Sequence, residues 1–171
     1  MPLDIEVVKT TKRDLDNVCM LWNDGDVMRY VGFPEGLGVS TDQLEKWLAS
    51  IDGSPFREHF SIYARTLGYC GESFYSADEP HRMAALDIKL LRKARGHGIA
   101  QKALMHAIEQ AFSTGVVDTV YVDPDPANQK ALRLYERLGF KPAPRPSFLE
   151  PSKTHYELTF EQYTKIKKAK G

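Results

Sequence analysis

The stretch that most limits the possible fold of this chain is residues 83–115, where the pattern of apolar residues changes. Met83–Leu91 is a nearly continuous apolar run, which predicts a central strand buried on both faces. A basic segment with two glycines follows, and from Ala100 the apolar residues recur at helical spacing until Gly115. A strand, a glycine loop and a helix in this order predict an α/β fold, with a mixed sheet covered by helices.

The loop between this strand and helix has the composition of an anion site. Gly96 and Gly98 let the backbone approach a ligand closely, and Arg92, Lys93 and Arg95 bring positive charge. The first amides of the helix have no intrahelical partners, and the helix dipole adds partial positive charge. These features fit a phosphate or pyrophosphate. The alternative is a strand-to-helix turn that uses its glycines only for backbone geometry.

Two familiar phosphate-binding motifs do not match this loop. No Gly-Lys-Ser/Thr follows the glycines, and Gln101 stands where a dinucleotide motif would have its third glycine. A second block lies downstream, where Asn128 and Tyr135 precede Gly139 on a segment with helical spacing. Either Asp125 or Asn128 can cap that helix, and the sequence leaves both open.

The two blocks together resemble the GNAT N-acetyltransferase superfamily. Its acyl-CoA loop, Arg/Gln-x-x-Gly-x-Gly/Ala, is matched here by the run from Arg95 to Ala100, and its Asn-x-x-Ala-x-x-x-Tyr-x-x-x-Gly-Phe signature by Asn128–Phe140. Segments 22–24 and 27–31 are weakly similar to the branch that includes ribosomal-protein alanine and aminoglycoside 6′-acetyltransferases. The resemblance implies a GNAT-like acyl-CoA N-acyltransferase fold over a single domain, residues 1–171.

The expected element order is β-α-α-β-β-β-α-β-α-β-β, with helices on both faces of the sheet. This order matches the superfamily. The last strand is expected at Thr154–Phe160, and the basic run Lys165–Lys170 is expected to be a solvated, fraying end. The other predicted strands cover residues 4–9, 59–65, 69–76, 83–91 and 116–122, and a further strand begins at 140. The predicted helices follow residues 14, 40 and 99, and the last one follows either 125 or 128.

The resemblance implies acetyl-CoA as cosubstrate. The backbone of Ile88 and Leu90 would pair with its pantetheine arm, and Asn128 would contact the arm or its bound water, unless Asn128 only starts a helix. The side chain of His97 is expected to be an exposed loop histidine rather than a ligand. The amides that would hold the pyrophosphate belong to Arg95, Gly96, His97, Gly98, Ile99 and Ala100.

Three residues are the catalytic candidates. Tyr135 matches the superfamily's tyrosine that donates a proton to the departing thiolate, and a phenol is protonated at neutral pH. Its position on an apolar stripe also allows a packing role. Asp87 lies in an otherwise apolar strand, and Glu72 on the neighbouring strand, so either can serve as base or amine ligand. Each can equally be an ion-pair partner or lie at an exposed strand end.

The function that the resemblance implies is transfer of an acetyl group from acetyl-CoA to a primary amine, on a small molecule or a protein N-terminus. The alternative is a non-catalytic acyl-CoA-binding sensor or regulatory module. Tyr135 and the carboxylates favour an enzyme. A nucleotide-phosphate binder would need residues that read a ribose or base, and no such pattern is visible. The resemblance also admits a homodimer.

Composition limits the other classes. The chain of 171 residues has 23 basic and 23 acidic side chains, so its formal net charge of zero favours neither nucleic acid nor a membrane surface. Five scattered histidines and the pair Cys19 and Cys70 lack ligand or redox spacing, so we expect no metal site and reduced thiols. The first ten residues lack the apolar core of a signal peptide, and a cytoplasmic location is expected.

Overall fold

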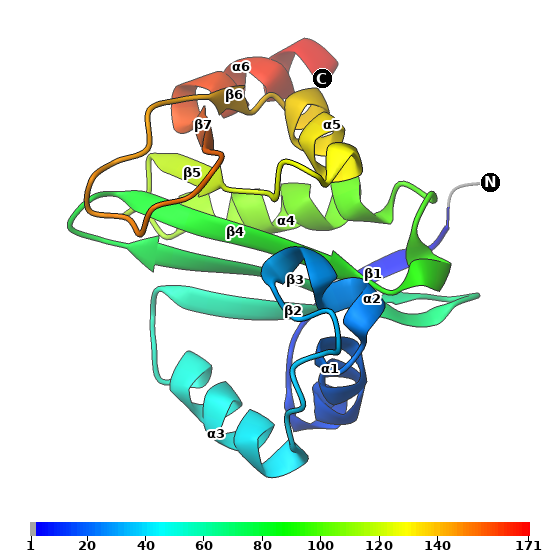
Figure 1. Ribbon diagram of the computed structural model, residues 1–171. Coiled ribbons are helices and arrows are strands. Elements are labelled where there is room, and N and C mark those ends of the chain that lie inside the picture. Colours follow the sequence, from blue (N-terminus) through cyan, green and yellow to red (C-terminus); the bar gives the residue numbers. More distant parts are fainter. Residues whose placement is uncertain (1–2) are drawn as a thin grey trace.

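The computed structural model describes residues 3–171 and contains a seven-stranded mixed sheet (Figure 1). The strand order is β1-β2-β3-β4-β5-β7-β6, and every neighbouring pair is antiparallel except β4 and β5, which are parallel. The strands are β1 (Ile5–Lys9), β2 (Arg57–Ala64), β3 (Gly68–Asp78), β4 (Met83–Leu90), β5 (Thr119–Val122), β6 (Lys141–Pro142) and β7 (Tyr156–Thr159).

Helices cover both faces of this sheet, as predicted. In Figure 1, α1 and α3 lie below the sheet, whereas α4 and α5 lie above it. The helices are α1 (Leu15–Trp22), α2 (Gly25–Met28), α3 (Thr41–Asp52), α4 (Ile99–Ser113), α5 (Gln129–Leu138) and α6 (Phe160–Lys170), and three short 3-10 turns occupy Lys12–Asp14, Arg29–Val31 and Arg92–Ala94.

The face of the sheet under α4 is apolar. Phe60 and Leu86 from the strands pack in one buried cluster with Leu104 and Ile108 of α4. Both helix residues are completely shielded from solvent, so all of their apolar side-chain surface contributes to the free energy of folding. The amphipathic stripe that the sequence predicts from Ala100 onward is therefore the main contact between α4 and the sheet.

The C-terminus differs from the prediction. The last strand ends at Thr159 rather than Phe160, and the basic run is part of α6. The Thr159 hydroxyl accepts a hydrogen bond from the Gln162 amide, and the Gln162 side chain accepts one from the Thr159 amide, which forms a capping box. This cap ends the strand at Thr159, although apolar and polar residues alternate from Tyr156 to Phe160. Tyr163 packs the helix against the core.

The strand that feeds the glycine loop also needs a correction. β4 is central, as predicted, but only its first half is well buried. β5 pairs with Met83–Ala85 alone, and it begins at Thr119 rather than at Val116. β3 continues to pair with β4 as far as Leu90. From Leu86 onward β4 therefore has a neighbour on one side and an open edge on the other.

Candidate active site

The parting of β4 and β5 opens a cleft of about 760 Å³. One wall is the second half of β4, another is the loop into α4, and a third is the end of β5 with α5. The α2 region adds Arg29 and Tyr30 at the rim. Both sequence blocks thus face one cavity. Of the residues predicted for the site, those that line it are Asp87, Ile88, Leu90, Arg95, Gly96, Gly98, Ile99, Ala100, Asn128 and Tyr135.

The open edge of β4 presents backbone groups to the cleft. The Ile88 amide donates to the Asp87 carboxylate at 2.9 Å, and the Leu90 carbonyl accepts two hydrogen bonds from the Arg95 guanidinium at 3.1 and 3.2 Å. These groups therefore point away from β3. An extended molecule lying along this edge can pair with the backbone as an added strand does, which is the arrangement predicted for Ile88 and Leu90.

The loop into α4 depends on its two glycines. Gly96 and Gly98 have φ of 81° and 75°, a left-handed conformation that other residues rarely adopt. A Cβ at either position would meet nothing within 4 Å, so the space beside the loop is open. The buried Ile99 side chain fixes the first turn of α4. His97 is exposed and does not line the cleft.

Of the three loop cations that the composition indicates, Arg95 lines the cleft, whereas Arg92 and Lys93 do not. The Arg95 guanidinium is held by the Asp26 carboxylate at 3.0 Å as well as by Leu90, so it braces the loop. Three cations of α5, Lys130, Arg133 and Arg137, line the same cleft. Their i, i+3, i+7 spacing on one helical face was a signal that the sequence analysis missed.

The structure decides which residue caps α5. The Asn128 side-chain oxygen accepts a hydrogen bond from the Ala131 amide at 3.2 Å, which makes Asn128 the N-cap. Asp125 accepts from the Ala127 amide at 2.8 Å, in the turn that precedes the helix. Asn128 lines the cleft as well, so capping and ligand contact are compatible at this position.

Tyr135 lies on α5 with its ring buried and its side chain in the cleft lining. The ring packs edge-on against Phe140, with 5.5 Å between the ring centroids. Burial raises the pKa of Tyr135 above its ordinary value, and the negative charges of Asp87 and Asp123 raise it further. The phenol is therefore protonated at neutral pH, which is the state that a general acid needs. Asp123, which lines the cleft, was not singled out from the sequence.

The two candidate carboxylates differ in their surroundings. Asp87 lines the cleft, its side chain is 43% exposed, and it pairs with Lys89. Glu72 is buried behind Lys89 and is not among the cleft-lining residues. It accepts hydrogen bonds from Trp22 Nε1 at 2.8 and 2.9 Å and is also paired with His59.

The charge state of Glu72 follows from these partners. Burial alone would raise the pKa of Glu72, but His59, Lys89 and the Trp22 indole outweigh burial and lower the pKa to about 2. A carboxylate that is ionised, buried and surrounded by donors is a poor proton acceptor for a substrate. The geometry therefore separates the two candidates that the sequence treats together.

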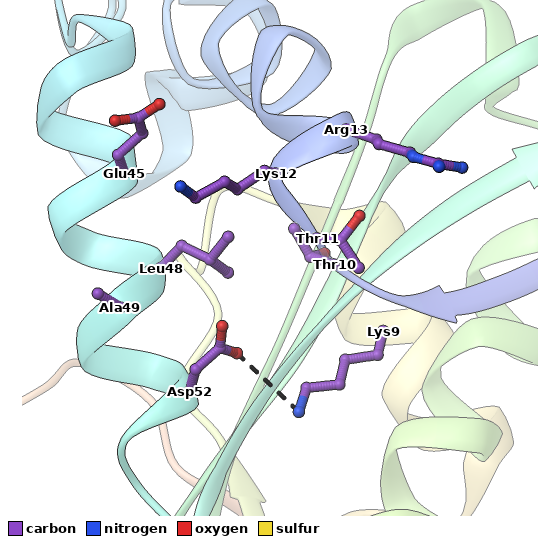
Figure 2. A pocket seen from close by; sticks show the side chains of 9 residues that line it. All are labelled: Lys9, Thr10, Thr11, Lys12, Arg13, Glu45, Leu48, Ala49 and Asp52. Atoms are coloured by element: carbon purple, nitrogen blue, oxygen red, sulfur yellow. Dashed lines mark ion pairs between the residues drawn. The ribbon is translucent and has the colours of Figure 1, made fainter.

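A second hollow, of about 680 Å³, lies between the end of β1 and α3 (Figure 2). Lys9 and Asp52 form an ion pair across it, with 3.9 Å between Nζ and Oδ1, and both side chains are half exposed. None of the predicted site residues lines this hollow. No glycine lines it, and neither of the two sequence blocks reaches it, so the chemistry suggested by the sequence belongs to the first cleft.

Two further findings concern the whole described chain. Within residues 3–171, no three His, Cys, Asp or Glu side chains come together in a way that could hold a metal ion. Over the same range, no helix is both long enough and apolar enough to cross a membrane.

Comparison of the sequence with known families gives a match to the acetyltransferase (GNAT) domain over residues 4–141. An uncharacterised N-acetyltransferase p20 of Bacillus licheniformis is 26% identical over 140 residues, which is 78% of this chain and 76% of that protein. An aminoglycoside N(6′)-acetyltransferase type 1 of Klebsiella pneumoniae is 25% identical over 60% of this chain, and this match spans half of the Klebsiella protein.

Solved structures share the fold. The spermidine N-acetyltransferase of Vibrio cholerae, in complex with CoA and spermine, superimposes with a TM-score of 0.79 at 20% identity, over 94% of this chain and 98% of that one. A GNAT-family acetyltransferase of Streptococcus pneumoniae gives a TM-score of 0.76 at 16% identity, over 92% of this chain and 100% of that one. At these identities the likeness concerns the architecture.

Proposed function

Because the chain belongs to the GNAT acetyltransferase family, we propose that it transfers the acetyl group of acetyl-CoA to an amine in the cleft between β4 and β5. The observation that carries this proposal is the convergence of three features in one cavity: the open edge of β4, the glycine loop and Tyr135. Nothing in the described cleft favours a non-catalytic acyl-CoA sensor. The acceptor that we propose is a primary amine.

The chemistry of the cleft suits acetyl-CoA, which supplies the acetyl group as a thioester open to attack by an amine. The loop amides between Arg95 and Ala100, together with the α5 cations, would hold the pyrophosphate and its neighbouring phosphate. The backbone of Ile88 and Leu90 would align the pantetheine arm, and Asn128 would contact it.

Two side chains would carry out the two proton transfers of the reaction. An alkylammonium has a pKa near ~10 and must lose a proton before it can attack. Asp87, half exposed at the cleft edge, would bind the ammonium and accept that proton. Tyr135 carries its own proton at neutral pH, and it would pass this proton to the departing thiolate.

A turnover assay tests this assignment. Purified protein is mixed with acetyl-CoA and a panel of primary amines, namely spermidine, an aminoglycoside and a peptide with a free N-terminus, and release of the CoA thiol is measured. With the best acceptor, Tyr135→Phe and Asp87→Asn should each lower kcat about 100-fold or more, which is the usual contribution of a positioned acid or base.

Two variants serve as matched controls. Tyr163→Phe removes a hydroxyl that contacts Glu109 on α4, and Asp118→Asn neutralises an exposed carboxylate that pairs with Arg82. Both should retain kcat within about twofold, because neither residue lines the cleft. Equal activity in Tyr135→Phe and Tyr163→Phe would contradict the role of Tyr135, and the same comparison of Asp87→Asn with Asp118→Asn tests the base.

A further inference from the structure

We propose that Lys89 is a positioning residue that holds the Asp87 carboxylate in place for the acceptor amine, and that Glu72 anchors Lys89 from inside the protein. This inference rests on the proposed role of Asp87. It gives Glu72 and Lys89 a function in the same reaction, although only Lys89 borders the cleft and neither would touch the reacting atoms.

The geometry places Lys89 between two carboxylates on one face of the sheet. Its ammonium pairs with Asp87 on one side and lies 3.5 Å from Glu72 Oε1 on the other. The Lys89 side chain is only 13% exposed, whereas that of Asp87 is 43% exposed. Glu72, Lys89 and Asp87 thus lie in this order from the interior to the surface, and Asp87 is the one that a substrate can reach.

Glu72 is held more firmly than an ordinary ion-pair partner. The Trp22 indole donates to both of its oxygens, and His59 contacts it from β2. His59 is fixed in turn by the Thr10 hydroxyl, 2.7 Å from its Nδ1, and by the edge-on ring of Trp47, with 4.7 Å between ring centroids. Lys89 therefore meets a rigid acceptor, and the position of its ammonium is determined by the core.

A fixed cation matters because of where Asp87 lies. It sits on the half of β4 that β5 no longer covers, so packing alone leaves its side chain free to change rotamer. The Ile88 amide and Lys89 both contact it, and Lys89 is the partner that remains when a pantetheine arm pairs with the Ile88 backbone. Catalytic groups need supporting contacts of this kind, since a displacement of about 1 Å can lower a rate about 100-fold.

Lys89 and Glu72 are both unsuited to carrying protons away. Burial would lower the pKa of Lys89, but the charges of Asp87 and Glu72 outweigh burial and raise it above its ordinary value. The pKa of Glu72 is lowered to about 2, mainly because His59 and Lys89 outweigh its burial. Neither Lys89 nor Glu72 changes protonation near neutral pH, so both act as fixed charges beside Asp87.

A double-mutant cycle on kcat tests the inference. Lys89→Met should lower kcat about tenfold or more in the wild-type background, while KM for acetyl-CoA changes less than about threefold. In the Asp87→Asn background the same substitution should have almost no further effect, because Lys89 acts through a carboxylate that is no longer there. Lys89→Arg, which keeps the cation, should recover most of the lost rate.

Two further variants make the outcome decisive. Lys165→Met, which removes an exposed ion pair with Glu161 on α6, should leave kcat unchanged. Glu72→Gln combined with Lys89→Met removes both buried charges, so it keeps the test valid if the single variant folds poorly; melting temperature and acetyl-CoA binding report folding. Additive losses in the cycle, or full activity of Lys89→Met, would overturn the inference. Full activity of Asp87→Asn would overturn the role of Asp87 itself and the inference with it.

Discussion

The two faces of the sheet are built on different principles. Under α4 the strands present apolar side chains such as Phe60 and Leu86, which pack against the apolar stripe of the helix. Under α1 and α3 the same strands present a row of polar groups from Thr10 through His59 and Glu72 to Lys89. β4 contributes to both faces, since Leu86 and Ile88 alternate with Asp87 and Lys89 along it.

The difference shows how the fold combines a stabilising apolar core with charged groups held at defined positions. An apolar face stabilises in proportion to the area it buries and tolerates small rearrangements. A polar face needs every donor and acceptor matched, but it can hold a charge at a defined point. In this molecule the polar row ends at the cleft, where Asp87 is exposed. The following changes test the contrast between the two faces, from the largest expected effect to the smallest.

Truncation on the apolar face should have the largest effect on stability. Leu104→Ala removes a side chain that is completely buried between α4 and the sheet. We expect the free energy of unfolding to fall by about 2 to 5 kcal/mol, because a cavity remains where the side chain was. Urea denaturation followed by circular dichroism measures this change. A loss below about 1 kcal/mol would show that the apolar face is loosely packed.

Low pH should destabilise the protein through Glu72, on the polar face of the sheet. Since the folded-state pKa of Glu72 is lowered to about 2 from an ordinary 4.5, its contribution to stability is present above pH 4.5 and is lost as the pH falls through about 2. The contribution amounts to roughly 3 kcal/mol. In Glu72→Gln, unfolding measured between pH 5 and pH 2 should therefore depend less on pH than in the wild type.

The exposed carboxylate of Asp118 provides the control for this experiment. Asp118→Asn should keep the steep pH dependence of the wild type, because its side chain is 57% exposed and its ion pair is screened by water. If the free energy of unfolding depends on pH equally in Glu72→Gln and Asp118→Asn, Glu72 does not make this contribution to stability.

Loss of one hydroxyl should have a smaller effect on the polar face. Thr10→Val preserves shape but removes an oxygen that lies 2.7 Å from both His59 Nδ1 and Ser61 Oγ. We expect a destabilisation of about 1 to 3 kcal/mol, because two buried polar groups lose a partner. Thermal unfolding of Thr10→Val beside Thr66→Val, whose side chain is exposed in the turn between β2 and β3, measures it. Equal melting temperatures would mean that the polar row is not tightly matched.

The smallest effect is expected outside both faces. Lys165→Met removes an i, i+4 ion pair on α6, in which both side chains are about three-quarters exposed. The free energy of unfolding should change by no more than about 0.5 kcal/mol. A larger change, measured by the same urea titration, would show that α6 depends on surface charge and not on the Tyr163 contact with the core.

Much of the fold follows from apolar periodicity. The stripe of α4 and the positions of the central strands follow from apolar patterns that are repeated over many residues, although the second half of β4 is less buried than its composition predicts. The terminal helix α6 was missed, since the alternation of Tyr156 and Leu158 continued into Phe160. The Thr159–Gln162 capping box was available in the sequence as a signal against a longer strand.

The cleft was only partly predictable. Its glycine loop and Tyr135 belong to contiguous motifs, so the sequence identifies them directly. The cluster of Glu72, Lys89 and His59 depends on the register of three strands, with Glu72 opposite both Ser61 and Lys89. No local pattern encodes that register. The sequence therefore offered two equivalent carboxylates where the structure has one in the cleft and one in the core.

The central claim is that the loop into α4 binds acetyl-CoA, and calorimetric titration of acetyl-CoA tests it most directly. Gly98→Trp would fill the space beside the loop, whereas Gly115→Trp introduces the same residue just past the other end of α4, where the glycine also has positive φ and open surroundings. The account predicts micromolar binding by the wild type and by Gly115→Trp, with none by Gly98→Trp. Equal binding by both variants, or no binding by the wild type, would contradict it.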